Sequence, residues 1–173
     1  MNKIIFLDID GVLNDINDMK ENIKISRIIY NIANPYLNRN YEQKKEYTSI
    51  NFSFEKIEIL KEIIRETDAK IVLSSSWRSN LVVDALIDKG VPIIGITPYL
   101  EQKRGKEIKE YLKNNDYISF CILDDELCDF EKEGLLDYLV RTDGYLYNGL
   151  SYEHIDMVKE VLSCNKKRIL KKD

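Results

Sequence analysis

Three short, mainly apolar runs in this chain each end abruptly in side chains that carry oxygen. They are residues 3–7 before Asp8 and Asp10, residues 70–73 before Ser74, and residues 117–123 before Asp124 and Asp125. A nearly continuous apolar run of this length is typical of a strand that is covered on both faces, as in a parallel sheet. The carboxyl ends of parallel strands meet at one edge, where ligands bind. The pattern therefore predicts a parallel sheet with a polar site at one edge.

Amphipathic helical patterns alternate with these runs. They cover residues 54–64 after Ser53, residues 81–86 before Gly90, a stretch that opens at Arg104, and one that follows Ser151. Further short strands are expected at residues 91–94 and 139–141, and Pro92 keeps the first of these from a fully paired central position. The alternation predicts an α/β fold, a Rossmann-like three-layer sandwich around a five-stranded parallel sheet. The length predicts a single domain over residues 1–173.

Residues 14–51 interrupt this alternation. The segment is polar and rich in asparagine, with one weak helical stretch at residues 23–32 and a break at Asn34-Pro35. We interpret it as an insertion or small flap outside the core.

Composition excludes several functional classes. The 26 basic and 30 acidic residues leave a net charge of −4, so neither a strongly basic nor a strongly acidic surface is implied. We expect no membrane partner, because no apolar run approaches the roughly 18 residues that span a bilayer. The three cysteines form no CxxC pair and the N-terminus is not of the export type, so we expect a cytoplasmic protein without disulfides. Cys121, inside an apolar run, is expected in the core.

The acids themselves point to a hard metal ion. Asp8 and Asp10 are two residues apart on a strand end, so both carboxylates face one volume, and Gly11 lets the backbone bend after them. Asp124 and Asp125 add two more carboxylates at the same edge. Because neighbouring carboxylates repel and no thiolate or histidine accompanies them, Mg²⁺ is the expected occupant.

Such a site suits phosphoryl transfer. A carboxylate can attack phosphorus, the Ser74 hydroxyl can bind a phosphoryl oxygen, and Arg104 or Lys106 at a helix start can balance the charge. Each piece alone is also typical of an ordinary turn, a helix cap or a solvated surface. Their order along the chain, each at a strand end or helix start, favours the functional interpretation.

This ordered series resembles the four motifs of the haloacid dehalogenase (HAD) superfamily. The matching motifs are Asp8-Ile9-Asp10-Gly11-Val12, Ile71-Val72-Leu73-Ser74, Arg104 or Lys106, and Ile122-Leu123-Asp124-Asp125. At the level of individual residues, the sequence is similar to the HAD phosphatase-type domain of multi-enzyme RNA-repair proteins of the Swiss Army Knife type. The residues that carry this similarity include Ser74-Ser75-Ser76-Trp77-Arg78 and Arg104-Gly105-Lys106-Glu107-Ile108. The sequence is more distantly similar to polynucleotide 3′-phosphatase domains. Val12 replaces the threonine that is commoner in the superfamily.

The resemblance implies a Mg²⁺-dependent phosphatase that forms an aspartyl phosphate. Asp8 would be the nucleophile, and Asp10 the general acid and then the base. An acid at Asp10 favours a phosphatase over a dehalogenase or an ATPase. The remaining roles are a metal set of Asp8, Asp10 through its backbone carbonyl, Asp124 and Asp125, and a phosphate-binding set of Ser74, Ser75 and Arg104, with Lys106 as the alternative cation.

The expected substrate is inferred from the lack of a large cap in this sequence. Family members that act on small molecules often carry a large cap, but residues 80–103 hold only a core helix and strand. We therefore expect a minimal cap or none, and a phosphorylated RNA or DNA end as substrate, with Trp77 and Arg78 as contacts to a base and a phosphate. Small-nucleotide and phosphoprotein phosphatases stay open, as do a receiver-like module and a non-catalytic phosphate-binding module.

Two remaining residue groups carry weaker expectations. His154, the single histidine, is expected on the surface of the last helix. Tyr145 and Tyr147, near Asn148-Gly149, suggest a hairpin-like turn at the rim of the site.

Overall fold

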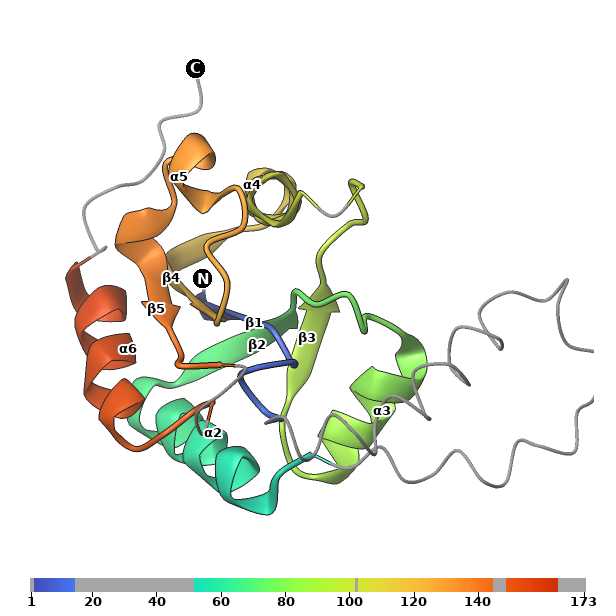
Figure 1. Ribbon diagram of the computed structural model, residues 1–173, viewed down its shortest axis with the longest axis vertical. Helices are drawn as coiled ribbons and strands as arrows, with labels where there is room; N and C mark the ends of the chain where they lie inside the picture. The colour runs from blue at the N-terminus through green and yellow to red at the C-terminus, as the bar shows by residue number, and fades with distance from the viewer. Residues whose placement is uncertain (1, 15–51, 102, 145–148, 165–173) are drawn as a thin grey trace, which may run out of the picture.

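The structure, a computed structural model, describes residues 2–14, 52–101, 103–144 and 149–164 (Figure 1). Of the expected insertion at residues 14–51 only Asn14 is described, and the helix at residues 23–32 and the turn at Tyr145 and Tyr147 lie outside the described residues.

The described residues form one five-stranded sheet in which every pairing is parallel. Its strands are β1 (Asn2–Leu7), β2 (Ala69–Leu73), β3 (Ile93–Ile96), β4 (Tyr117–Asp124) and β5 (Leu139–Arg141), in the spatial order β3-β2-β1-β4-β5. The predicted five-stranded parallel sheet is confirmed. The direction of the winding reverses between β1 and β4, which is the switch point where ligands bind in such sheets. A receiver domain has the order 2-1-3-4-5 instead, so this topology contradicts the receiver-like alternative.

One strand differs from its expected position. β3 begins at Ile93 and not at residue 91, so Pro92 lies just before the strand. Proline has no N–H to donate to a ladder, which explains why pairing with β2 starts only after it. β3 is an edge strand, as Pro92 predicted.

Helices cover both faces of the sheet (Figure 1). One core cluster holds α2 (Phe54–Thr67), α3 (Asn80–Asp88) and α6 (Glu153–Cys164), and the other holds α4 (Arg104–Asn114), the short α5 (Phe130–Glu133) and the 3₁₀ turn η2 (Leu136–Tyr138). Along β1, Ile5 and Leu7 enter the first cluster, and Ile4 and Phe6 enter the second. This alternation of buried side chains on both faces is what a central parallel strand requires, and it confirms the three layers.

His154 is a correction to the sequence-based expectation. Its side chain is buried, and the Ser151 backbone N–H donates to its Nδ1 at 3.0 Å. The imidazole therefore accepts from a backbone N–H just before α6, the bond that the Glu or Gln of a capping box commonly accepts. That local bond explains why a polar ring occupies a core position.

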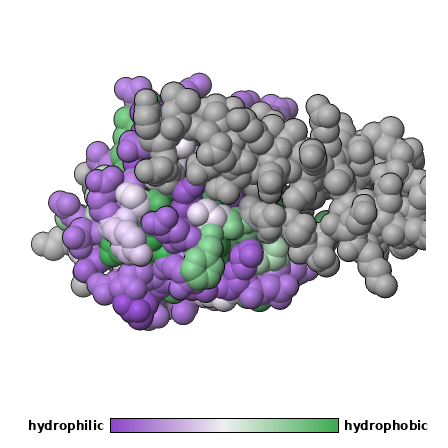
Figure 2. Space-filling model, turned by 60° about the horizontal axis from the view of Figure 1, so that its bottom comes forward, coloured by the Kyte–Doolittle hydropathy of each residue, from purple (hydrophilic) through white to green (hydrophobic). Residues whose placement is uncertain are grey.

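The expected core position of Cys121 is confirmed. Cys121 is fully buried in the core, and Cys121, Cys128 and Cys164 are free thiols. Among the described residues, no helix is both long and apolar enough to cross a bilayer. On the face that Figure 2 shows, the described side chains are mostly hydrophilic, and apolar ones form only small patches between them.

Candidate active site

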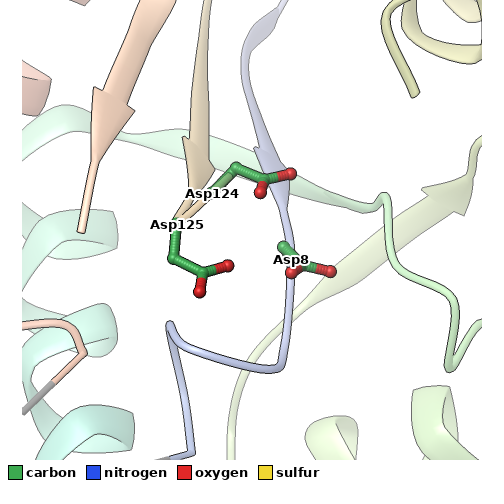
Figure 3. A group of neighbouring side chains, drawn as sticks. All are labelled: Asp8, Asp124 and Asp125. Carbon is green, nitrogen blue, oxygen red and sulfur yellow. The ribbon is translucent and has the colours of Figure 1, made fainter. Parts of the chain in front are cut away.

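Three carboxylates meet at the switch point of the sheet. Asp8 directly follows β1, Asp124 is the last residue of β4, and Asp125 is the next residue (Figure 3). One oxygen from each lies within 4.8 Å of the others. Parallel pairing fixes this convergence, because the Asp8 N–H donates to the Leu123 carbonyl of β4 at 2.9 Å. The side chain of Asp10 is not part of this group, and only its backbone carbonyl was expected to bind metal.

The same carboxylates are buried, which makes their charges costly. Asp8 is 6% exposed and Asp124 is 1% exposed. Burial raises the pKa of both, and the charge of Asp8 raises the pKa of Asp124 further. Burial and then Asp8 raise the pKa of Asp125 to about 6. A cluster of buried oxygen anions with raised pKa values fits a hard divalent cation such as Mg²⁺, and Asp8, Asp124 and Asp125 would hold it.

Arg104 supplies the positive charge in this cluster. Its Nη1 lies 2.8 Å from Asp8 Oδ1 and 2.8 Å from Asp124 Oδ2, and it donates to the Ser74 carbonyl at 2.7 Å. The two carboxylates raise the pKa of the guanidinium, so it stays protonated. Lys106, the other candidate, has an exposed side chain. The geometry therefore favours Arg104 as the cation beside Asp8.

The serine loop after β2 presents two hydroxyls with different surroundings. The Ser74 N–H donates to the Leu7 carbonyl at 2.8 Å, which holds the loop beside β1. Ser74 Oγ is buried and has no hydrogen-bond partner among the described residues. The Ser75 hydroxyl instead hydrogen-bonds to Asp8 and accepts from the Trp77 N–H at 3.2 Å. Ser74 is thus left with bonding capacity for a ligand, whereas Ser75 orients Asp8.

Asp10 has the properties of a group that exchanges protons. Burial and the nearby Asp8 raise its pKa to about 6, although hydrogen bonds from Trp77 and Asn14 oppose the rise. Its Oδ1 is buried and makes no hydrogen bond to any described residue. Trp77, expected to contact substrate, therefore lies against the carboxyl group of Asp10.

Gly11 allows the acids to approach one another. Its φ is +73°, and a Cβ on it would lie 2.2 Å from Asp125 Oδ2. A side chain at this position would both strain the backbone and displace the carboxylate. The glycine was expected from the bend, but its contact with Asp125 was not.

The guanidinium of Arg78 is fully engaged within the chain. Its Nη2 lies 2.7 Å from Glu107 Oε2, its Nε donates to the Ser75 carbonyl at 2.6 Å, and its Nη1 donates to the Pro98 carbonyl at 2.8 Å. We call this ion pair and its bonds the Arg78–Glu107 clasp. It connects the serine loop, the loop after β3 and the first turn of α4. In this arrangement Arg78 positions the site, and the phosphate contact expected of it would require the clasp to open.

Two residues of the site went unassigned in the sequence. Glu107 lies on the buried face of α4 with Ile108, and a charge among apolar helix positions was the signal that could have found it. The Thr142 hydroxyl donates to the Gly11 carbonyl at 2.7 Å, which ties the end of β5 to the acidic loop. A threonine after a short strand carries no comparable signal.

Comparison with known families decides the identity of the chain. The model of the HAD domain in Swiss Army Knife RNA repair proteins matches residues 4–155. This chain belongs to that family. The matched range includes the three converging carboxylates, the serine loop and Arg104, so the resemblance seen in the motifs is confirmed over nearly the whole domain. Family membership supports a HAD-type hydrolase as the class of activity.

Neither the curated proteins nor the solved structures contain a match to this chain.

Proposed function

We propose that this HAD domain is a Mg²⁺-dependent phosphomonoesterase that works through an aspartyl phosphate on Asp8. The observation that carries the proposal is the setting of Asp8. Its carboxylate lies 2.8 Å from the Arg104 guanidinium, next to the serine loop whose Ser74 hydroxyl has no described partner. A nucleophile, a cation and a spare hydroxyl at one point are what a transferring phosphoryl group needs.

In the first step, a carboxylate oxygen of Asp8 bonds to phosphorus and the bond from phosphorus to the leaving oxygen breaks. Asp10 gives its proton to that oxygen, so the alcohol leaves neutral. A pKa of about 6 leaves part of Asp10 protonated near neutral pH, which suits this task. Arg104 and the Ser74 hydroxyl hold the phosphoryl oxygens during the transfer. Bound Mg²⁺ would supply further neutralisation of phosphate charge.

In the second step, Asp10 takes a proton from water as the water oxygen bonds to phosphorus. The bond between Asp8 and phosphorus breaks, which releases inorganic phosphate and restores the Asp8 carboxylate. Asp10 is again protonated and ready for the next cycle. Ser75, hydrogen-bonded to Asp8, keeps the carboxylate in the same orientation for both steps.

We further propose a phosphorylated RNA or DNA end as the substrate. The family description names RNA repair proteins, and the described residues between β2 and Arg104 comprise only α3, β3 and their loops. These described residues build no cap that would restrict the site to small molecules. The competing substrates are a free nucleotide and a phosphoprotein.

The test is phosphate release from four substrates, with Mg²⁺ and with a chelator. They are a 3′-phosphorylated oligonucleotide, the matching mononucleotide, a phosphopeptide and p-nitrophenyl phosphate. The proposal predicts Mg²⁺-dependent release with the highest kcat/KM for the oligonucleotide, loss of release in Asp8→Asn, and wild-type release in Asp84→Asn, which alters an exposed aspartate of α3. No Mg²⁺-dependent release from any substrate would overturn the activity. A higher value for the mononucleotide or the phosphopeptide would overturn the substrate.

A further inference from the structure

We infer that Tyr99 is the stacking surface for a nucleobase at the phosphorylated end of a polynucleotide. The inference rests on the proposed function and names how that site distinguishes a polynucleotide from other phosphate esters. Tyr99 follows β3 and its side chain is 67% exposed. Phe54 and Tyr152 are about as exposed, so exposure alone does not single out Tyr99; its anchored backbone and its position beside the site do.

The backbone on both sides of Tyr99 is fixed. The Pro98 carbonyl accepts from Arg78 Nη1 at 2.8 Å, and the Leu100 N–H donates to Glu107 Oε1 at 2.8 Å. Both partners belong to the Arg78–Glu107 clasp, in which the Glu107 side chain is fully buried. The ring is therefore presented on an anchored loop, so little loop ordering opposes ligand binding.

The clasp also supports the ring electrostatically. The Arg78 guanidinium carbon lies 5.7 Å from the centroid of the Tyr99 ring, within the range of a cation–π contact. The Arg78 side chain is only 11% exposed and is held by its ion pair, so the cation stays in place. Stacked arrays of a guanidinium, an aromatic ring and a base are a common way to bind single-stranded nucleic acid.

Tyr99 lies at the edge of the sheet that carries the reacting groups. The Thr97 N–H donates to the Leu73 carbonyl at 3.0 Å, directly before Ser74, and the loop that contains Tyr99 leads into Arg104. Trp77, next to Arg78, bonds to Asp10. Aromatic surface thus lies on the β2–β3 side of Asp8, and a nucleoside that extends from its phosphate to that side would meet it.

A nucleobase suits this surface better than the other candidate ligands. Every base has a flat π face, and stacking on a protein aromatic ring tolerates any sequence. A sugar phosphate lacks such a face. A phosphopeptide presents one only where an aromatic residue happens to adjoin the phosphate.

The experiment removes the Tyr99 ring and the nucleobases separately and together. Wild type, Tyr99→Ala and Tyr99→Phe are each assayed on a 3′-phosphorylated oligonucleotide and on the same oligonucleotide made abasic at its last two positions. Ile118→Ala, an exposed apolar residue of β4 near the opposite edge of the sheet, is the matched control. Binding of both oligonucleotides to the Asp8→Asn variant, with and without Tyr99→Ala, is measured in parallel.

In wild type, Tyr99→Phe and Ile118→Ala, removing the bases should lower kcat/KM by about 5- to 150-fold, the range that one stacked base gives. In Tyr99→Ala the two oligonucleotides should give the same kcat/KM. If Tyr99→Ala keeps the full preference for bases, or lowers both substrates equally, the inference is overturned. If wild type hydrolyses neither oligonucleotide, the proposed substrate fails, and the inference then stands or falls on whether Tyr99→Ala weakens base-dependent binding in Asp8→Asn.

Discussion

At the scale of single residues, the carboxylates of the site repel one another when no metal ion is bound, and this repulsion destabilises the folded state. Asp8, Asp124 and Asp125 approach one another within 4.8 Å, and Arg104 is the one described cation shown to pair with two of them. Burial is the first cause of the raised pKa values of Asp124 and Asp125, and repulsion from Asp8 is an added cause. Stability should therefore depend on pH in a direction opposite to that of ordinary salt-bridged carboxylates.

Asp125→Asn should reveal this repulsion. The pKa of Asp125 is raised from 3.8 to about 6, so the folded wild type loses stability as pH rises through that interval. The amide cannot ionise, and the variant should be more stable than wild type by about 1 kcal/mol above pH 7, because solvent screens this half-buried group. The pH-dependent part of the difference should vanish below the unfolded pKa of 3.8, at about pH 3. Urea unfolding at several pH values, with a chelator present, measures the difference in unfolding free energy between the two proteins. A difference that does not change with pH would contradict the prediction.

Asp10→Asn should separate proton transfer from metal binding. The substitution keeps the backbone carbonyl that we expect to bind Mg²⁺ but removes the acid and base, so turnover should fall by about 10²–10⁴-fold. Mg²⁺ affinity, from calorimetric titration, should stay within about twofold of wild type. A loss of affinity as large as that of Asp124→Asn would make the Asp10 side chain a ligand.

The sequence predicted the acids and the serine loop because each ends a buried strand, and parallel pairing then brings strand ends together. It did not predict the partners of Arg78, because an ion pair between residues 78 and 107 depends on how two loops and a helix meet. His154 was assigned to the surface for a similar reason. Whether a polar ring is buried depends on a partner such as the Ser151 N–H, which residue type alone does not specify.

At the scale of elements, the first turn of α4 performs two tasks. Arg104 reaches Asp8, and Glu107, three residues later, holds Arg78. The backbone N–H of Gly105 also donates to Asp129 Oδ1 at 2.6 Å, and a Cβ there would come 3.0 Å from Glu133. The start of this helix is thus fixed from both sides, and the position of Arg104 follows from the position of the helix.

Glu107→Gln should weaken both the fold and the site. The amide keeps the shape and can still accept from Leu100, but Arg78 loses its countercharge in a buried setting, which we expect to cost about 3 kcal/mol of unfolding free energy. Because α4 carries Arg104, KM should rise as well. The matched control is Glu131→Gln, at an exposed position of α5. If Glu107→Gln kept wild-type stability and KM, the Arg78–Glu107 clasp would not be needed to position α4 and Arg104.

Helices and strands were predicted correctly where the apolar pattern was long, and the bounds of one edge strand, β3, were predicted wrongly. The helix from Arg104 and the strand ending at Asp124 agree with the sequence pattern, because a sustained apolar period identifies each. β3 was placed two residues too early because its apolar residues begin before Pro92, whereas its ladder begins after it. The apolar pattern reports burial, but strand limits are set by hydrogen bonds.

At the scale of the whole molecule, metal binding should be coupled to folding. A cation that neutralises the three carboxylates binds only when β1 and β4 are paired, so it stabilises the folded state. At about 100 times the dissociation constant this gives about 2.7 kcal/mol, or a Tm rise of roughly 5–10 °C for a domain of this size. Scanning calorimetry with and without Mg²⁺ measures the rise.

Asp124→Asn should abolish most of that rise, and Asp84→Asn should keep it. Because Asp124 is a buried member of the cluster, its replacement by an amide removes a ligand charge that no described neighbour replaces. A Tm rise of the same size in Asp124→Asn would place the Mg²⁺ site elsewhere.

The proposed mechanism requires Asp8 to carry the phosphoryl group during turnover. The most direct measurement is an acid quench of wild type during steady-state hydrolysis of a phosphorylated oligonucleotide with Mg²⁺, followed by mass spectrometry of the peptide that contains Asp8. A covalent step on Asp8 should give a phosphoryl adduct there that needs Mg²⁺ and decays when substrate is exhausted. Sustained phosphate release by wild type with no adduct on Asp8, together with undiminished release by Asp8→Asn, would contradict it.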